Sequence, residues 1–310
     1  PLEEEAKSFV EYAHSLGFNL ILDLPSCGSY DLSLKKPSWF LWKQNGETQE
    51  TLTPADWTDV RLFKVHNVDT KELNEATLTN FKSFVDFALD LGFDGIRADV
   101  AAIKPYSFWK EIIDYARNKN KNFLFIAEAS PDWQNPAQTG VSHYATIQEL
   151  LDSGFDGYYG SWSDFKNIKT KKEFDLKISK NQKILENNKD KAIMFAAATH
   201  DQQAPILRGV NYWNMVLWLD VTMPHNSYFL DGFSTGDNYI YPWENQKAKE
   251  TYTDDEFYFV HSGMFDIFNL SSMPSGNYPK LKKNYLRAID FKTRNADLIK
   301  NGTFSLLKTN

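Results

Sequence analysis

The sequence predicts an α/β fold built around a parallel sheet, and two observations lead to this prediction. Apolar segments of strand length alternate with amphipathic segments of helix length along most of the 310 residues. In three places a helix ends at Gly-Phe and passes directly into a strand, at Gly17-Phe18, Gly92-Phe93 and Gly154-Phe155. Glycine after a helix adopts the left-handed backbone conformation at low cost, so each junction marks one helix–strand unit. Strands separated by helices form parallel sheets, which are either closed barrels or open doubly wound sheets.

The remaining elements follow in chain order from periodicity. Apolar side chains at helical spacing give the first helix one apolar face, formed by Ala6, Phe9, Val10, Ala13 and Leu16. Further helices are expected at 70–91, 106–117, 143–151, 171–186, 204–219 and 281–298. Strands are expected after the three Gly-Phe junctions, at 19–23, 95–99 and 157–160, and at the continuous apolar runs 123–127 and 192–198, with 226–230 as a sixth candidate.

Two long stretches show neither pattern and are expected to be irregular. Residues 25–70 follow the first strand and residues 232–279 follow the last, and both are rich in Trp, Asn, Pro and Asp. Loops of this length in a folded domain are usually functional, and in a (β/α) barrel the loops after the strands form the active-site face.

Composition limits the class of protein and its partners. The chain is 42% hydrophobic and 24% charged, as in folded globular proteins, and its net charge of −7 without a basic block argues against a nucleic-acid partner. The single Cys27 excludes an internal disulfide. No apolar run approaches the roughly 18 residues of a membrane span, and the first residues are acidic where a signal peptide is basic. We therefore expect a soluble chain without a membrane partner, and favour a cytoplasmic location.

Charged residues end four of the expected strands. They are Asp23, Asp99, Glu128 and the pair His200-Asp201, which follows Thr199. One such residue alone is more often a helix cap or a loop charge. Several at the carboxyl ends of parallel strands indicate a catalytic rim instead.

Two of these carboxylates suit complementary roles. Arg97 and Asp99 are two apart on a strand, so both side chains project to one face, where a guanidinium keeps a carboxylate ionised and nucleophilic. Glu128 follows five apolar residues, so we expect dry surroundings, a raised pKa and the role of a general acid. Retaining glycoside hydrolysis requires such a pair at about 5 to 5.5 Å.

The same segments resemble the alpha-amylase family of glycoside hydrolases and transglycosidases, whose catalytic domain is a (β/α)8 barrel. Gly95-Ile96-Arg97-Ala98-Asp99 is similar to the family's G-F-R-x-D segment at the end of its fourth strand. Phe125-Ile126-Ala127-Glu128 is similar to the fifth-strand segment, and Thr199-His200-Asp201 to the seventh-strand N-H-D segment. The order and spacing of the three segments also agree with the family.

The resemblance implies a role for each matched residue. Asp99 would be the nucleophile, Glu128 the general acid/base and Asp201 the stabiliser of the transition state. Arg97 and His200 would bind beside them, as partner of the nucleophile and as a substrate contact. Other expected substrate-binding residues are Asp23, the one residue kept from the third-strand segment, Tyr30, a candidate to replace that segment's histidine, and Trp133, which lies where it could stack on a sugar.

The sequence departs from the family pattern near two of these residues. The third-strand D-x-x-x-N-H segment reads Asp23-Leu24-Pro25-Ser26-Cys27-Gly28, without the histidine that contacts the sugar or the asparagine that binds calcium in many members. Ala102-Ile103 replaces the Lys-His that follows the nucleophile in typical alpha-amylases. We therefore expect no cofactor and no metal site; calcium stays possible, but its usual ligand segment is not matched.

The resemblance also defines the expected domain. The Gly17 junction corresponds to the helix before the third barrel strand, so the fold expected is a partial TIM (β/α)8-type barrel with about strands 3 to 8. It would span residues 1–299 with a short insertion at about 25–70, and 300–310 would begin a C-terminal β-domain or tail. Because six strands cannot close an eight-stranded barrel, upstream sequence or a partner would supply the missing strands.

The function expected is a retaining glycoside hydrolase acting on alpha-glucans or maltooligosaccharides, so that the partner is an oligosaccharide or polysaccharide substrate. Two alternatives stay open: an alpha-glucan transglycosidase, such as a glucanotransferase or maltosyltransferase, and a non-catalytic carbohydrate-binding barrel. A nucleotide-binding open sheet is disfavoured, because no glycine-rich phosphate loop follows any strand.

Overall fold

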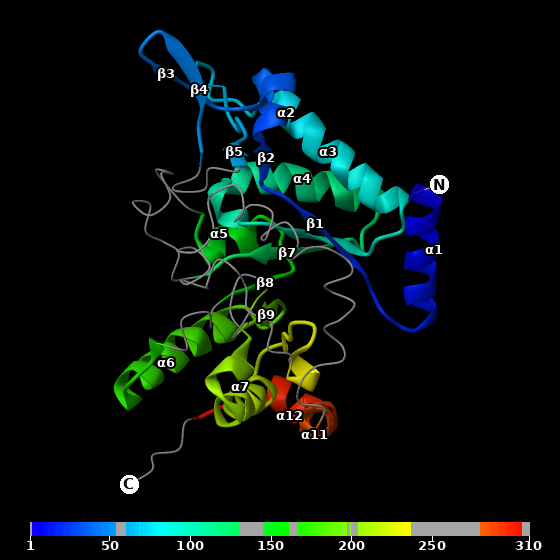
Figure 1. The fold of residues 1–310 in the computed structure, drawn as a ribbon, viewed down its shortest axis with the longest axis vertical. Coiled ribbons are helices and arrows are strands. Elements are labelled where there is room, and N and C mark those ends of the chain that lie inside the picture. Colours follow the sequence, from blue (N-terminus) through cyan, green and yellow to red (C-terminus); the bar gives the residue numbers. More distant parts are fainter. Residues whose placement is uncertain are drawn as a thin grey trace. The chain divides into compact units, whose positions relative to one another are not determined.

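A computed structural model of the chain describes residues 2–53, 60–67, 69–130, 145–160, 167–196, 199, 204–236 and 280–305. Contacts between residues divide the chain into two compact units, residues 1–159 and residues 160–310. Most elements of each unit are labelled in Figure 1. No helix in the described ranges has both the length and the apolar character needed to cross a membrane.

The first unit contains a parallel sheet of four strands. They lie in the order β1 (Ile21–Leu24), β6 (Gly95–Ala98), β7 (Leu124–Glu128) and β8 (Gly157–Tyr159). In the register of β1 and β6, Asp23 is opposite Arg97, and Ala98 of β6 is opposite Ala127 of β7. All four strands were predicted, three of them from the Gly-Phe junctions and β7 from its apolar run. Because they are parallel, their carboxyl ends meet at one edge of the sheet (Figure 1).

The helices of this unit are α1 (Leu2–Ser15), α3 (Glu75–Asp90), α4 (Tyr106–Lys119) and α5 (Ile147–Asp152). Aromatic rings in edge-to-face contact join α3 to α4: Phe81 of α3 lies 5.0 Å from Phe108 of α4, measured between ring centroids. The predicted apolar face of α1 is only partly buried. Val10 and Ala13 are covered, but Phe9 and Leu16 are 61% and 57% exposed, so periodicity identified the helix and overestimated its packing.

The three Gly-Phe junctions have the backbone that was predicted. Gly17, Gly92 and Gly154 all have positive φ angles, of 84°, 87° and 117°. At each junction the N–H of the following phenylalanine donates to the carbonyl five residues back, as Phe93 does to Ala88 at 3.0 Å. This is the Schellman arrangement, which satisfies a helix carbonyl and turns the chain into the next strand.

Two of the junctions continue with an aspartate that sequence reasoning did not single out. The Asp94 carboxylate accepts from the Leu20 backbone N–H at 2.7 Å, and Asp156 accepts from the N–H of Phe125 at 2.8 Å. Asp94 lies just before β6, and Leu20 lies just before β1, the strand next to β6 in the sheet. Asp156 lies just before β8, and Phe125 belongs to the neighbouring strand β7. The three residues Gly-Phe-Asp therefore end a helix and also connect two adjacent strands.

The predicted irregular stretch 25–70 has regular structure of its own, so that prediction was wrong. It contains β2 (Cys27–Ser29), α2 (Tyr30–Lys35), a 3-10 turn (Pro37–Trp39), β3 (Trp42–Asn45), β4 (Thr48–Thr51) and β5 (Val60–Leu62). β2 pairs with β5 and β3 with β4, both antiparallel. These strands have three or four residues, several of them polar and exposed, so they show too little alternation to be recognised in sequence.

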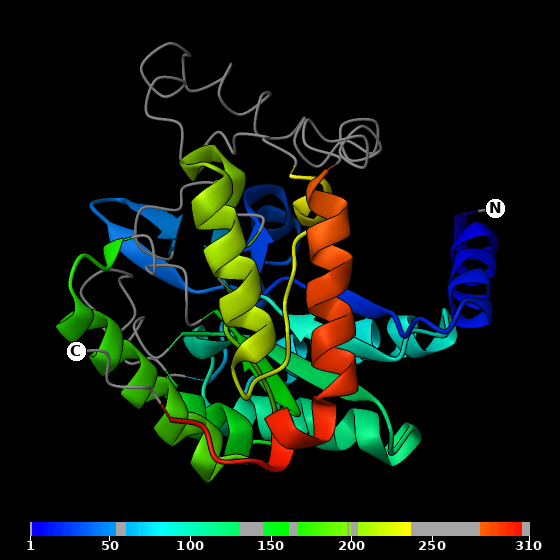
Figure 2. The same ribbon diagram turned by 90° about the horizontal axis from the view of Figure 1, so that it is seen from below.

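The second unit is mostly helical where the structure describes it. Its elements include α6 (Lys171–Asn187), β9 (Ala192–Met194), α7 (Val210–Thr222), a 3-10 turn (Phe233–Thr235), α11 (Leu281–Arg294) and α12 (Ala296–Asn301). Figure 2 shows α7 and α11 side by side. Between them lies a core that includes Trp213, Leu217, Phe233 and Ala288, with the Trp213 and Phe233 rings stacked at 5.1 Å.

Two predicted elements of this unit differ from the structure. Residues 226–230 do not form a strand; Asn226 makes a single parallel bridge with Met194, and the following residues are irregular. The helix predicted at 281–298 is divided at Asn295 into α11 and α12. Asparagine readily leaves helical geometry because its side chain competes for backbone hydrogen bonds, and Asn295 donates from its side chain to Phe291.

Candidate active site

Arg97 occupies the centre of the carboxyl edge of the sheet and contacts all four strand ends. Its Nη1 donates to Asp23 at 2.5 Å and to Asp99 at 2.8 Å, and its Nε donates to the hydroxyl of Tyr159 at 2.7 Å. Nη2 lies 2.7 Å from Oε2 of Glu128 as an ion pair, although not in hydrogen-bond geometry. These five residues are called the Arg97 cluster below.

The acidic side chains of the Arg97 cluster differ in their access to solvent. Asp23 is 58% exposed and Asp99 33%, whereas Glu128 is 6% exposed and the Arg97 side chain 14%. Burial by itself would lower the pKa of Arg97, but the charge of Glu128 and those of its other neighbours outweigh it and raise this pKa. Arg97 is therefore a permanent cation, with one enclosed and two accessible carboxylates around it.

Glu128 has the dry surroundings that its sequence context predicted. Its Oε2 also accepts from the backbone N–H of Val100 at 2.9 Å. Val100 has φ of 38° and ψ of 50°, a left-handed conformation that is unfavourable for a β-branched residue and that stores strain typical of functional sites. The contact with Arg97 was not predicted, because that guanidinium was assigned to Asp99 alone. The role of Glu128 as proton donor stays a prediction.

The other predicted site residues lie elsewhere or outside the described part of the chain. Tyr30 is the first residue of α2, 48% exposed, and packs against the guanidinium of Arg61, whose Cζ is 4.8 Å from the ring centroid. No contact between Tyr30 and the Arg97 cluster is among those the structure describes. Trp133, His200 and Asp201 fall outside the described residues, and the adjacent Thr199 is buried.

Sequence reasoning missed two residues of this region, Tyr159 and Lys104. Tyr159 ends β8, so the rule that applied to the charged strand ends would have found it if extended to tyrosine. Lys104 follows the apolar run Val100 to Ile103 and is 2% exposed. A lone lysine in an apolar run was the available signal for it.

The chemistry of the described residues gives no indication of a metal. Among them, no group of three or more His, Cys, Asp or Glu side chains is arranged to hold an ion. The expectation that the protein uses no cofactor stays a prediction.

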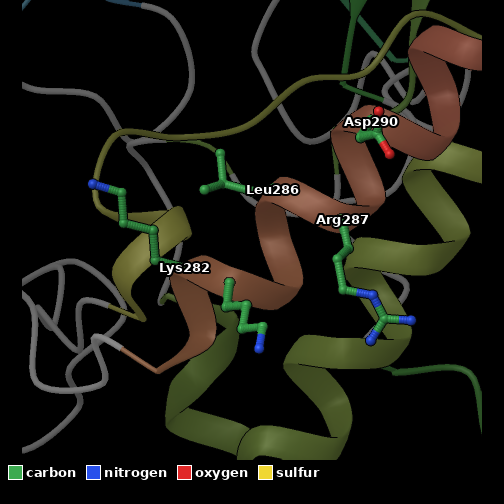
Figure 3. Close-up of a pocket in the computed structure, with 5 residues that line it drawn as sticks. Lys282, Leu286, Arg287 and Asp290 are labelled. Carbon is green, nitrogen blue, oxygen red and sulfur yellow. The ribbon is translucent and has the colours of Figure 1, made fainter.

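A hollow of about 540 Å³ also lies on the surface of α11 (Figure 3). The described residues that line it are Lys282, Lys283, Leu286, Arg287 and Asp290. All five come from consecutive turns of one helix, so this is a shallow groove between long side chains rather than an enclosed pocket.

The fold and the Arg97 cluster together define a class: an α/β protein of the (β/α)-barrel type with its carboxylates gathered at the carboxyl ends of the strands. No family model matches the chain. In sequence, it is similar to alpha-amylase MalA of Haloarcula japonica, with 27% identity over 134 residues, or 40% of this chain and 19% of that protein. It is also similar to the alpha-1,4-glucan:maltose-1-phosphate maltosyltransferase of Methylacidiphilum infernorum, with 29% identity over 129 residues, or 41% and 19%.

Solved structures show the same fold over nearly the whole chain. The alpha-amylase of Lactobacillus plantarum superposes with a TM-score of 0.65 at 17% identity, covering 97% of this chain and 65% of that one. The Anoxybacillus alpha-amylase gives 0.66 at 13% identity, covering 98% and 63%. The matched part amounts to about a fifth of the length of the curated relatives, 19% in both. The predicted resemblance to the alpha-amylase family is confirmed, and the parallel sheet is part of an α/β barrel of that type.

Proposed function

We propose that this chain carries the catalytic centre of a retaining enzyme that hydrolyses alpha-glucans such as maltooligosaccharides. The observation that supports this most strongly is the meeting of Asp99 and Glu128 at one guanidinium, one carboxylate accessible and the other enclosed. A double displacement at an anomeric carbon needs one carboxylate that can reach the sugar and a second that exchanges a proton with the leaving oxygen and then with water. The similarity to alpha-amylases supports the choice of alpha-glucan as substrate.

In the proposed mechanism, a carboxylate oxygen of Asp99 attacks the anomeric carbon while the bond to the leaving oxygen breaks. Glu128 gives its proton to that oxygen, and a covalent glycosyl–Asp99 ester results. Glu128, now a carboxylate, takes a proton from water, whose oxygen displaces Asp99 and restores both groups. Arg97 orients Asp99 for the attack through the 2.8 Å hydrogen bond between Nη1 and the Asp99 carboxylate. Asp201 and His200 take the roles that the resemblance implies, stabilising the transition state and contacting the sugar.

Transfer instead of hydrolysis is the second candidate, and a specific observation favours it. Proteins similar to this chain include maltosyltransferases from Methylacidiphilum infernorum and Salinibacter ruber, named for alpha-1,4-glucan and maltose 1-phosphate. The first half of the mechanism is then unchanged. In the second half, a sugar hydroxyl or phosphate takes the place of water as the acceptor.

Product analysis with maltooligosaccharides, with and without inorganic phosphate, distinguishes these functions. Hydrolysis gives shorter oligosaccharides in both conditions, whereas chain redistribution or a sugar phosphate would identify a transferase. Replacing Asp99→Asn should abolish turnover and leave glucan binding intact. The matched control is Asp114→Asn, an exposed carboxylate on α4 that pairs with Lys110. A turnover rate of Asp99→Asn equal to that of the wild-type chain would refute the assignment, and glucan binding without wild-type turnover would identify a non-catalytic barrel.

A further inference from the structure

Lys104 is a buried cation in an aromatic environment next to the Arg97 cluster. Its side chain is 2% exposed, and its Nζ donates to the backbone carbonyl of Ser26 at 2.6 Å. The same Nζ lies 5.4 Å, 5.3 Å and 5.6 Å from the ring centroids of Phe63, Phe81 and Phe108. Cation–π contact with desolvated rings stabilises an ammonium group that would otherwise be costly to bury.

The hydrogen bond of Lys104 joins two segments that both lead from the site. One runs from the last residue of β1, Leu24, to the first residue of β2, Cys27, and the other is the turn after β6, from Asp99 to Lys104. At one end the Asp99 N–H donates to the Leu24 carbonyl at 3.0 Å, and at the other Lys104 Nζ donates to Ser26. The turn that carries the proposed nucleophile is thus attached to its neighbour at both of its ends.

The turn between these attachments is strained, so it depends on being held. Val100, next to Asp99, has the left-handed backbone described above, and its N–H faces Glu128. A β-branched residue keeps this conformation only where surrounding contacts over-determine it. Lys104 supplies such a contact at the far end of the turn.

The charge on Lys104 also has to be maintained against its surroundings. Burial lowers the pKa of Lys104 to about 8, while Cys27 and Asp99 act in the opposite direction. The rings of Phe63, Phe81 and Phe108 add no titratable group. A methionine of similar length would fill the same volume without a charge to desolvate, so packing alone does not explain a lysine at this position.

We propose that Lys104 is a positioning residue whose buried ammonium group clamps the segment after β1 to the turn after β6, and so holds Asp99 in place against Arg97. This inference rests on the proposed function, because it assigns Lys104 a part in the reaction at Asp99. When the ammonium group loses its proton, the cation–π contacts vanish and the hydrogen bond to Ser26 weakens, so the clamp loosens.

The first test is the pH dependence of kcat/KM with an activated aryl alpha-maltooligoside. Its leaving group needs no proton from Glu128, so that residue does not shape the alkaline side of the profile. For the wild-type chain, kcat/KM should fall as the pH rises through about 8. Lys104→Met should lower kcat/KM at pH 7 roughly tenfold to hundredfold, as misplacement of a reacting group does, and should remove the fall near pH 8.

Two control variants isolate the effect to Lys104. Lys119→Met removes an exposed lysine of α4 that pairs with Asp86, and should leave the profile unchanged. Cys27→Ser removes the thiol that acts electrostatically on Lys104, and should keep the fall near pH 8. A Lys104→Met profile that still falls near pH 8, or a rate equal to that of the wild-type chain, would overturn the proposal.

The second test does not depend on activity and uses Cys27, the single and buried cysteine of the chain. Cys27 directly follows Ser26, so its rate of reaction with a thiol reagent at pH 7 reports opening of the clamped segment. Cys27 should react faster in the Lys104→Met variant than in the wild-type chain. The unfolding midpoint of the variant should not be lower than that of the wild-type chain. Equal labelling rates would refute the clamp, and faster labelling with a lower midpoint would mean that the lysine only stabilises the core.

The two tests separate this inference from the proposed function. If the wild-type chain turns over and Asp99→Asn does not, an unaltered Lys104→Met variant counts against the clamp alone. If no wild-type turnover is found, the proposed function fails and the catalytic part of this inference fails with it. In that case the labelling of Cys27 decides whether Lys104 holds the two segments together.

Discussion

The Arg97 cluster of the first unit and a second group of buried charges in the second unit use similar chemistry in different ways. In the second group, the Asp220–His225 group, His225 Nε2 lies 2.9 Å from Asp220 Oδ1, and the side chains are 1% and 5% exposed. Lys292 donates to the backbone carbonyls of both, and to that of Met223. In the Arg97 cluster, the cation contacts carboxylates that solvent reaches. In the Asp220–His225 group, the cation of Lys292 contacts backbone carbonyls.

The balance between burial and neighbouring charge differs accordingly. At Arg97 the surrounding acidic groups outweigh burial and raise the pKa, so the cation is secure. At His225 burial outweighs the single Asp220 carboxylate and lowers the pKa. The Arg97 cluster has accessible carboxylates, so it can bind a substrate while Arg97 stays charged. The Asp220–His225 group is closed to solvent, so its role is to stabilise the fold. The predictions below test this distinction, from the largest expected effect to the smallest.

Glu128→Gln should lower turnover of an unactivated maltooligosaccharide by about a thousandfold, within the range that general acid catalysis contributes. The amide keeps the shape and cannot donate a catalytic proton. With an activated aryl glycoside, the first step should be affected far less, because the leaving group departs without protonation. A comparable loss with both substrates would mean that Glu128 acts through structure, as the Asp220–His225 group does.

Asp220→Ala should lower the free energy of unfolding by about 3 kcal/mol, because the buried His225 would lose its side-chain partner and the partly buried Lys292 would lose the nearby negative charge. Chemical denaturation with a probe in the second unit measures this change. Asp290→Ala is the matched control: that carboxylate pairs on the surface of α11 with Arg294 and should contribute little. A loss of turnover without a loss of stability in Asp220→Ala would contradict the assignment of this group to the fold.

His225 should make the second unit sensitive to acid. Its folded pKa lies below the unfolded value of 6.5, so below pH 6.5 the unfolded state binds a proton that the folded state resists. Stability should therefore be full above pH 6.5 and decline as the pH falls from 6.5 toward the folded pKa. Thermal unfolding of the wild-type chain and of His225→Gln across this range checks the sign; the same pH dependence in both would rule out His225 as its source.

Tyr159→Phe should have the smallest effect, a loss of several-fold in kcat/KM and of about 1 kcal/mol or less in stability, as for one hydrogen bond. The variant removes only the hydroxyl that accepts from Arg97 Nε and keeps the ring. Steady-state kinetics and denaturation in parallel measure both. A loss larger than that of Glu128→Gln would mean that the tyrosine, rather than the carboxylates, organises the Arg97 cluster.

Much of the fold could be predicted from sequence because its signals are local. The Gly-Phe junctions and apolar strands required only neighbouring residues, and so did the strand ends at Asp23, Asp99 and Glu128. The insertion was missed because its strands are short and polar, and the strand at 226–230 was overpredicted because an apolar run does not reveal whether a partner is in reach.

Apart from the local pair of Arg97 and Asp99, the contacts of the site could not be predicted because they join distant parts of the chain. Arg97 meets Asp23 across 74 residues and Tyr159 across 62, and Lys104 meets Ser26 across 78. Periodicity and spacing report which face of an element a residue occupies, and they contain no information on which distant backbone carbonyl a buried lysine will meet.

The Gly-Phe-Asp junctions also have a consequence for how the chain can vary in length. Asp94 closes a loop of 74 residues to Leu20, which includes the insertion, whereas Asp156 closes one of 31 residues to Phe125. Closing a loop that is about twice as long costs only about 0.6 kcal/mol more in chain entropy. One hydrogen bond from a carboxylate is enough to offset that difference. The same Gly-Phe-Asp sequence therefore connects neighbouring strands both where the chain between them is short and where that chain contains an insertion with small strands of its own.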